Sequence, residues 1–154
     1  MIELYTDEFF MREALKEAQK ALEISEVPVG AVVVCRNRVI ARAHNQTEKL
    51  TDATAHAEML VIRNAAAELG AERLDGADLY VTLEPCTMCA AAISFARLRR
   101  LYFGAKDEKG GAVLSGVRFF GMATCHHAPE VYSGLDEQRS AALLQDFFRQ
   151  RRGH

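Results

Sequence analysis

The order of predicted helices and strands indicates an α/β fold, a three-layer α/β/α sandwich around a central mixed sheet of about five strands. Two observations predict it. Short runs rich in β-branched residues, typical of buried strands, alternate with longer segments of helical periodicity. The 154 residues are 49% hydrophobic and 26% charged, an ordinary composition for a globular chain. We therefore expect a single domain over residues 1–154, long enough to bury a real core.

The first half of the chain predicts a helix, a hairpin and a second helix. Residues 7–23 have apolar side chains at helical spacing. Residues 29–35 are almost all apolar, which predicts a strand buried on both faces, and residues 39–44 follow after a tight turn as its hairpin partner. A polar loop then leads to a helix over residues 55–69, which Gly70 ends.

The second half predicts alternating strands and helices. Residues 79–83 form the third strand, and residues 85–96 form a helix, because proline fits the opening of one. Residues 101–104 form the fourth strand. The segment 106–134 is rich in glycine and is expected to be loop, with one short strand near 131–132. Residues 136–152 form the final helix.

Two short motifs carry metal-ligating residues, His56-Ala57-Glu58 and Pro85-Cys86-Thr87-Met88-Cys89. Zinc takes four tetrahedral ligands, so His56, Cys86 and Cys89 would leave one position for water, as in catalytic sites. H-x-E followed by P-C-x-x-C is the signature of zinc-dependent nucleobase deaminases. The motifs therefore predict a zinc site formed by these three ligands, with Glu58 as the catalytic proton carrier.

Both motifs lie at the start of a predicted helix. Cys86 and Cys89 are three residues apart, so both sulfurs can face one point, and the positive helix N-terminus favours thiolates. His56 and Glu58 do not share a face of a regular helix, so they must occupy its entry turn. Glu58 would then move protons from water to the ring and to the leaving amine. The backbone amide of Cys86 would stabilise the developing oxygen charge.

Other interpretations of the cysteine pair remain open. C-x-x-C is also a redox motif or half of a structural zinc site. A redox pair usually lacks a preceding proline with a distant His-x-Glu. A structural site needs a fourth protein ligand, for which the sequence offers Cys35, Cys125, His126 and His127. Cys35 lies in an apolar strand and is expected to be a core residue. The other three invite a second metal site, but adjacent residues rarely converge on one ion.

The net charge of −2 excludes a generally basic nucleic-acid-coating protein, so RNA contacts would need a local patch. The candidates are Arg149-Gln150-Arg151-Arg152 at the end of the chain, and Arg97, Arg99 and Arg100. No apolar run approaches the roughly 20 residues of a membrane span, and the N-terminal segment does not resemble a signal peptide. We expect a cytoplasmic location, where thiols stay reduced.

Longer segments resemble the bacterial tRNA-specific adenosine deaminases, the TadA family. The similarity runs from about Phe9 to Arg152 and is most specific over residues 79–90 and 146–152. It also includes Pro28-Val29-Gly30-Ala31-Val32-Val33, Thr54-Ala55-His56-Ala57-Glu58 and Phe103-Gly104-Ala105-Lys106-Asp107. The resemblance implies a cytidine-deaminase-like fold, a homodimer, one zinc ion per subunit, and conversion of the wobble adenosine in the tRNA anticodon loop to inosine. Residues 116–133 depart most from the family pattern.

The resemblance also implies roles for individual residues. Asn45 would hydrogen-bond the flipped purine, and Val29 and the backbone of Ala57 would line the base pocket. Lys106 and Asp107 would meet nucleotides beside the target base. The terminal helix would contact RNA by stacking of Phe148 and by phosphate contacts of Arg149, Arg151 and Arg152. Without the resemblance, this helix would be interpreted as an amphipathic one with solvated arginines.

Three functions remain open from the sequence. The first is a tRNA adenosine deaminase, and the second is a deaminase of a free base or nucleoside such as guanine or cytosine. The terminal Phe-Phe-Arg-Gln-Arg-Arg element favours the first, because a free base cannot use a remote stacking and phosphate patch. The third is a zinc-stabilised RNA-binding module without turnover. Glu58 argues against it, since a carboxylate beside an open zinc position serves no binding purpose.

Overall fold

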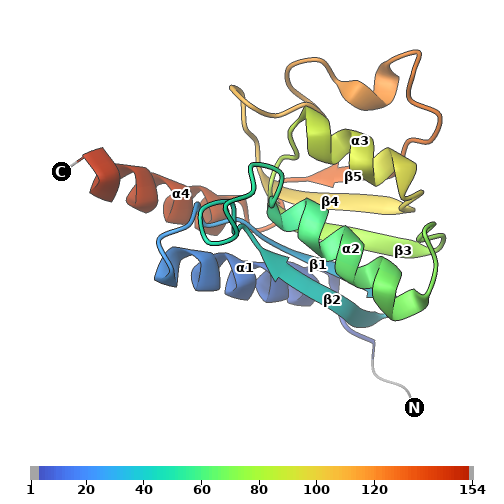
Figure 1. Ribbon diagram of the computed structural model, residues 1–154, viewed down its shortest axis with the longest axis horizontal. Helices are drawn as coiled ribbons and strands as arrows, with labels where there is room; N and C mark the ends of the chain where they lie inside the picture. Colours follow the sequence, from blue (N-terminus) through green and yellow to red (C-terminus); the bar gives the residue numbers. More distant parts are fainter. Residues whose placement is uncertain (1–3, 153–154) are drawn as a thin grey trace.

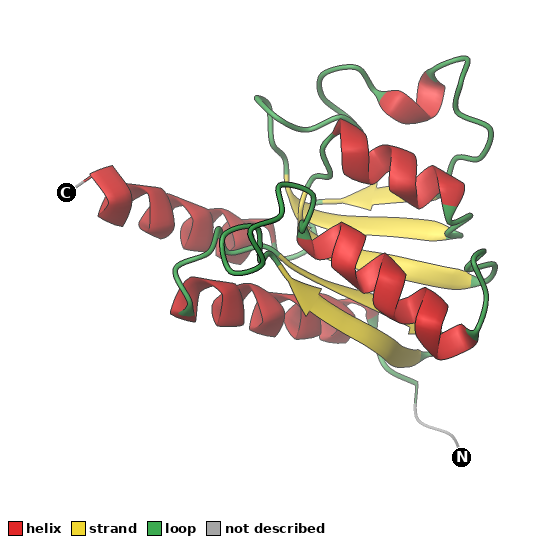
Figure 2. Cartoon of the chain, viewed as in Figure 1, coloured by secondary structure: helices red, strands yellow, loops and turns green. Residues whose placement is uncertain are grey.

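A five-stranded mixed sheet forms the centre of the protein, and helices cover both of its faces (Figures 1 and 2). The computed structural model describes residues 4–152. In chain order the elements are α1 (Asp7–Glu23), β1 (Gly30–Cys35), β2 (Arg38–His44), α2 (Ala57–Leu69), β3 (Ala77–Leu83), α3 (Thr87–Phe95), β4 (Arg100–Ala105), the 3-10 helix η1 (Phe119–Gly121), β5 (Glu130–Ser133) and α4 (Glu137–Arg152). The predicted fold class is confirmed.

Strand directions bring several functional segments to one edge of the sheet. The strand order is β2-β1-β3-β4-β5, with β1 antiparallel to both β2 and β3, and with β3, β4 and β5 mutually parallel. The carboxyl ends of β2, β3 and β4 therefore lie at the same edge of the sheet as the start of β1, and we call this edge the functional edge. Open α/β sheets usually place their ligand sites at such an edge.

The helices lie in two layers. α2 and α3 pack on one face and are in front of the sheet in Figure 1, whereas α1 and α4 pack on the other. α1 approaches the backbone of β1 closely at Gly30, where a Cβ atom would lie 2.1 Å from the carbonyl oxygen of Ala14. Only glycine permits this contact. It holds the start of β1, which borders the functional edge, against α1.

The predicted elements are confirmed with small differences at their ends. α2 and α3 begin later than expected, because His56 and Cys86 are the N-cap residues of these helices and have extended backbones. The short strand near residues 131–132 exists as β5 and pairs in parallel with β4. The 3-10 helix η1 is an addition to the predicted elements. Within residues 4–152, no helix combines the length and apolar character needed to cross a bilayer.

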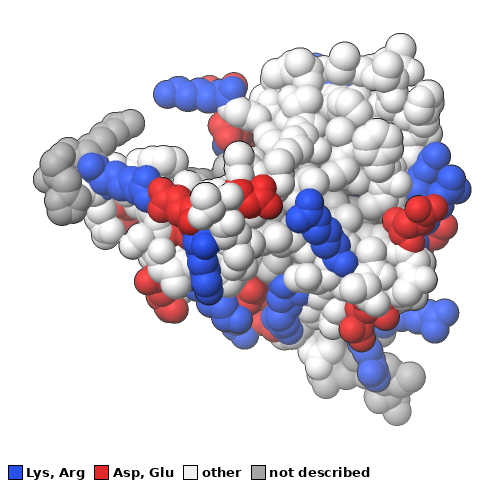
Figure 3. Space-filling view, viewed as in Figure 1, with Lys and Arg blue, Asp and Glu red and all other residues white. Residues whose placement is uncertain are grey.

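One side of the molecule carries few charged side chains. The space-filling view shows a broad area almost without Lys, Arg, Asp or Glu over α3 and part of the segment between β4 and β5 (Figure 3). Phe95, at the end of α3, has 79% of its surface exposed. A large exposed apolar side chain of this kind is typical of a protein–protein contact surface.

Candidate active site

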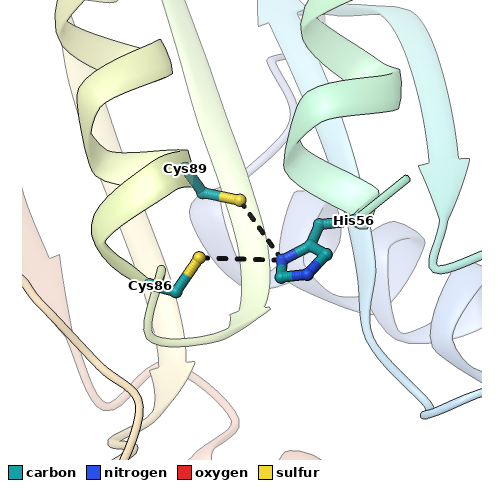
Figure 4. Close-up of side chains that lie close together, drawn as sticks. All are labelled: His56, Cys86 and Cys89. Carbon is teal, nitrogen blue, oxygen red and sulfur yellow. Dashed lines mark hydrogen bonds between the residues drawn. The ribbon is translucent and has the colours of Figure 1, made fainter. Parts of the chain in front are cut away.

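The three predicted metal ligands converge. The Nδ1 atom of His56 lies 3.7 Å from the Sγ atom of Cys86 and 3.5 Å from that of Cys89 (Figure 4). The three ligand atoms all lie within 4.8 Å of one another. Tetrahedral zinc with ordinary Zn–N and Zn–S bonds would separate nitrogen from sulfur by about 3.6 Å. The donor set and its nitrogen–sulfur distances therefore fit a zinc ion.

Helix starts place these ligands. His56 is the N-cap of α2 and Cys86 the N-cap of α3, while Cys89 lies in the first turn of α3. Neither N-cap side chain makes a capping hydrogen bond, so both are free to face the metal position. The extended backbone at His56 also meets the requirement that His56 and Glu58 occupy an entry turn. His56 precedes the helix, and Glu58 is its second residue.

The site favours a thiolate. A hydrogen bond from the Cys89 thiol lowers the pKa of Cys86 to about 4, against the opposing effect of burial, and His56 contributes a further lowering. The same hydrogen bond, together with burial, raises the pKa of Cys89. The hydrogen bond to Cys86 raises the pKa of His56. One sulfur is thus ready to bind a metal as a thiolate, the form that zinc requires.

Glu58 is buried beside the ligands, with only 4% of its surface exposed. Burial raises its pKa to about 7, and the nearby His56 only partly offsets this. A carboxyl group with a pKa near neutrality can both accept and return a proton at physiological pH. Glu58 therefore has the environment expected of a catalytic acid–base residue.

The candidates for a fourth protein ligand lie elsewhere. Among the residues that the structure describes, no other His, Cys, Asp or Glu joins the group of His56, Cys86 and Cys89. Cys35 is half-buried at the end of β1. The Sγ atom of Cys125 contacts the Ser94 hydroxyl at 3.5 Å and the carbonyl oxygen of His127 at 3.1 Å.

His126 and His127 also lie apart from the group of three ligands. The Nε2 atom of His127 lies 2.8 Å from the carbonyl oxygen of Leu98. His126 accepts a hydrogen bond from Arg97 through its backbone. The geometry therefore gives no support to a closed, four-ligand structural zinc site.

A pocket of about 210 Å³ opens beside the ligands. It contains four of the predicted substrate-binding residues, Val29, Asn45, Ala57 and Asp107, together with His56, Glu58 and Cys86. It also includes Val27, Thr47, Leu83 and Glu84. These residues come from the ends of β2, β3 and β4 and from the starts of β1, α2 and α3, all at the functional edge of the sheet.

Two buried glutamates that sequence reasoning missed hold the loops around this pocket. Glu26, 2% exposed, accepts hydrogen bonds from the side-chain amide of Asn45 at 3.3 Å and from the backbone of Glu48 and Lys49 at 2.8 Å each. Glu84, also 2% exposed, accepts hydrogen bonds from the loop after β4. Burial opposes the charge of Glu84, but its backbone hydrogen bonds outweigh this effect and lower its pKa. In the sequence, the one signal for each glutamate is its position as an acidic residue next to an apolar run.

The other predicted RNA-binding residues lie outside the pocket. Lys106 is exposed, as are Phe148 and Arg149 on α4. Arg149 pairs loosely with Asp146 at 3.7 Å. The side chain of Arg152 lies outside the described residues.

Arg151 makes internal contacts. Its guanidinium donates hydrogen bonds to the carbonyl oxygen of Ser25 at 3.1 Å and to the carboxylate of Glu48 at 3.2 Å. It also lies over the ring of Phe147, 4.6 Å from the centroid. These contacts anchor the end of α4 to the loop around the pocket and leave half of the Arg151 side chain exposed; the phosphate contact that the family resemblance implies for Arg151 stays a prediction.

The second predicted basic patch is neutralised. Arg99 forms a bidentate ion pair with Asp78 at 2.9 and 2.7 Å. Arg100 pairs with Glu130 at 2.7 Å. Since two of its three arginines are occupied by carboxylates, this region is not the cationic surface that the sequence suggested.

Comparisons with known proteins agree with the geometry. Residues 4–105 match the family described as "Cytidine and deoxycytidylate deaminase zinc-binding region". The chain is 68% identical over 143 residues to a tRNA-specific adenosine deaminase of Agrobacterium fabrum, covering 93% of this chain and 94% of the relative. It is 49% identical over 146 residues to one of Bacillus subtilis, covering 95% and 91%.

Solved structures show the same relationship. One from "Biochemical and Structural Studies of A-to-I Editing by tRNA:A34 Deaminases at the Wobble Position of Transfer RNA" has a TM-score of 0.87 and 68% identity, covering 88% of this chain and 99% of that chain. A guanine deaminase from Bacillus subtilis has a TM-score of 0.64 and 36% identity, covering 66% of each. The chain therefore belongs to the tRNA-specific adenosine deaminases, within the cytidine and deoxycytidylate deaminase zinc-binding family.

Proposed function

We propose that this chain converts the wobble adenosine of the tRNA anticodon loop to inosine by zinc-dependent hydrolytic deamination. The observation that carries the proposal is the convergence of His56, Cys86 and Cys89 beside the buried Glu58 in an open pocket. The full-length similarity to tRNA-specific adenosine deaminases supports the choice of substrate. One zinc ion per chain is held by the three ligands.

The chemistry divides between the metal and the chain's own groups. Zinc, when bound, supplies a Lewis acid that activates water near neutral pH. Glu58 accepts one proton from the water and delivers it to the adjacent ring nitrogen, while the water oxygen bonds to the carbon that carries the amine. Glu58 then accepts the proton of the added hydroxyl and passes it to the amine, so that the C–N bond breaks, ammonia leaves and the carbonyl of inosine forms. The backbone N–H of Cys86, at the start of α3, stabilises the charge that develops on the oxygen.

The pocket selects a single base. Its volume of about 210 Å³ is smaller than the sites of roughly 300–1,000 Å³ that enclose drug-sized ligands, which suits one flipped base. Asn45 hydrogen-bonds the purine, while Val29 and the backbone of Ala57 line the pocket. Asp107, at the rim, meets a neighbouring nucleotide.

The rest of the RNA contacts lie on α4 and beside β4. Phe148 is 46% exposed, as a stacking residue must be. Arg149 and Lys106 are exposed cations that can reach phosphates without breaking a strong ion pair. Arg151 and Arg152 extend this patch, and the half-exposed guanidinium of Arg151 also holds the helix end against the pocket loop.

A second copy of the chain covers the face over α3 that includes Phe95. This face contains a groove of about 550 Å³, lined by Ile62, Ala92, Phe95, Phe119 and Thr124 and by the charged side chains of Glu72, Arg73 and Arg97. The homodimer is also what the family resemblance implies. Phe95→Asp should convert the protein to a monomer in light-scattering chromatography, whereas Phe148→Asp on the opposite layer should leave the dimer intact.

We place the enzyme in the cytoplasm, where its tRNA substrate occurs and where the ligating thiols stay reduced. The deciding experiment offers the zinc-loaded protein a tRNA anticodon stem-loop with a wobble adenosine. Separate reactions contain adenosine, cytidine, cytosine and guanine, and both inosine and ammonia are measured. Inosine in the RNA alone supports the proposal. Ammonia only from a free base or nucleoside makes the protein a small-molecule deaminase, and turnover of none of them makes it a binding module.

A further inference from the structure

The carboxylate of Glu84 gathers five hydrogen-bond donors from a single loop. Its Oε1 atom accepts from the backbone N–H of Asp107 and from the hydroxyl of Ser115, each at 3.0 Å. Its Oε2 atom accepts from the backbone N–H groups of Val113 at 3.1 Å, Leu114 at 2.9 Å and Ser115 at 3.0 Å. Both oxygens are therefore saturated by the segment 107–115.

Among the described residues, no cationic side chain forms an ion pair with this buried carboxylate. None of the ion pairs formed within residues 4–152 includes Glu84. Burying an unpaired carboxylate is costly unless hydrogen bonds compensate, and backbone N–H groups that converge on an anion form such a compensating nest. Hydrogen bonds to a charged acceptor are about twice as strong as neutral ones. This arrangement is suited to fixing a loop that has little regular structure of its own.

Gly111 provides independent support for a close fit between the loop and Glu84. A Cβ atom at this position would lie 2.5 Å from the Cδ atom of Glu84 and 2.4 Å from the carbonyl oxygen of Asp107. Only glycine allows the loop to approach the carboxylate this closely. Gly121 lies in the same connection between β4 and β5, and a Cβ atom there would meet no other group within 4 Å. It therefore offers a matched position for comparison.

The five hydrogen bonds from segment 107–115 to Glu84, which we call the clamp, also connect the loop to a metal ligand. The backbone N–H of Glu84 donates to the carbonyl oxygen of Ala105 at 2.8 Å, and Ala112 donates to the carbonyl oxygen of Pro85 at 2.9 Å. Cys86, a metal ligand, is the residue directly after Pro85. Asp107, whose N–H binds Glu84, lines the pocket. One carboxylate thus ties the pocket wall to the chain segment that supplies a zinc ligand.

We propose that Glu84 is a positioning residue that holds segment 106–115 as one wall of the pocket and thereby sets where the RNA beside the target base binds. This inference rests on the proposed function. His56 and Glu58, which lie at the start of α2, do not depend on this wall. Loss of the clamp should therefore weaken substrate binding much more than it slows the chemical step.

The test compares Glu84→Gln and Gly111→Ala with Gly121→Ala as the control. Glutamine keeps the size of the side chain, but its NH2 group is a donor and cannot accept hydrogen bonds from the backbone N–H groups of segment 107–115. We expect amide hydrogen exchange at residues 107 and 113–115 to accelerate at least about tenfold in Glu84→Gln, the equivalent of one lost charge-assisted hydrogen bond. Amide hydrogen exchange in β1 and β3 should not change. The zinc content should also stay the same.

Kinetics on the anticodon stem-loop provide the second readout. In both clamp variants we expect KM to rise about tenfold, by the same reasoning, with kcat within about threefold of wild type. Gly121→Ala should match wild type in exchange and in KM. Gly111→Ala disturbs the clamp from the loop side, so it decides the matter if Glu84→Gln does not fold.

Several outcomes would overturn the proposal. Unchanged exchange in the loop would show that there is no clamp, whatever the substrate. Faster exchange with an unchanged KM, or a fall in kcat alone, would remove its role in substrate positioning. If Gly121→Ala changed hydrogen exchange and KM as much as the clamp variants do, these changes would not be specific to the clamp. Failure of the wild-type protein to form inosine would instead refute the proposed function, while the exchange measurement would still decide whether Glu84 holds the loop.

Discussion

Replacing Glu58 by glutamine should abolish turnover and leave the zinc site intact. The change keeps the size of the side chain but removes its ability to accept and return a proton. Glu58 is buried, and burial raises its pKa to about 7, so the folded protein gains nothing from keeping this group ionised. Glutamine at this position should therefore not lower the melting temperature.

The structure also indicates how large the loss should be. The other two carboxylates of the pocket are engaged in holding the loop: the oxygens of Glu84 are saturated by five donors, and the Oδ1 atom of Asp107 accepts from the backbone of its own loop. One positioned acid–base group contributes about 10²–10⁴-fold to a proton-transfer step. Since Glu58 acts in more than one transfer, we expect kcat to fall by at least about 10⁴-fold.

The assay is single-turnover formation of inosine in the anticodon stem-loop, with zinc content measured on the same sample. Glu68→Gln, on the exposed side of the same helix, is the control and should behave as wild type. Loss of zinc from Glu58→Gln would make Glu58 a ligand and refute this reasoning. A kcat within about tenfold of wild type would equally refute it, because another group would then carry the protons.

Three further outcomes are expected. Cys86→Ser should lose both bound zinc and inosine formation, whereas Cys125→Ser should keep both; zinc retained by Cys86→Ser would contradict the ligand set. Arg149→Ala should raise KM for the stem-loop and reduce the slope of log KM against log salt by about 1, with an unchanged slope counting against a phosphate contact. Glu13 is buried, which raises its pKa, but hydrogen bonds with a lysine and an arginine outweigh this and lower it below 4.5. Its stabilising effect is therefore present above pH 4.5 and lost as the pH falls through the lower folded-state value. Glu13→Gln should cost about 1 kcal/mol in urea unfolding at neutral pH and nothing in strong acid; an equal cost at both would refute the ion-pair explanation.

The sequence predicted the parts of this protein that depend on local patterns. Helical spacing identified α1 over its full length, and the apolar run before Arg36 identified β1. The motif around His56 and the Pro85–Cys89 segment predicted three residues that the structure brings together. Such features depend on residues close in sequence, so they can be recognised without knowing how distant segments meet.

Charge pairing could not be predicted in the same way. The sequence groups Arg99 and Arg100 with Arg97 as a basic patch, but their partners, Asp78 and Glu130, lie on other strands. The register of the sheet places Arg100 opposite both of them. Only this register shows that the positive charges are compensated, since cross-strand neighbours are distant in sequence.

The same reasoning separates the chemistry of the site from its selectivity. His56, Glu58 and Cys86 lie where helices begin at one edge of the sheet, so regular secondary structure fixes their positions. The loops that carry Asn45 and Asp107 receive no such support, and each is held by a buried glutamate instead. Glu26 and Glu84 bind backbone N–H groups, which do not depend on the loop side chains. Loop residues other than Asn45, Gly111 and Ser115 can therefore vary without loss of these contacts, so substitutions there should alter the accepted RNA before they alter the rate of deamination.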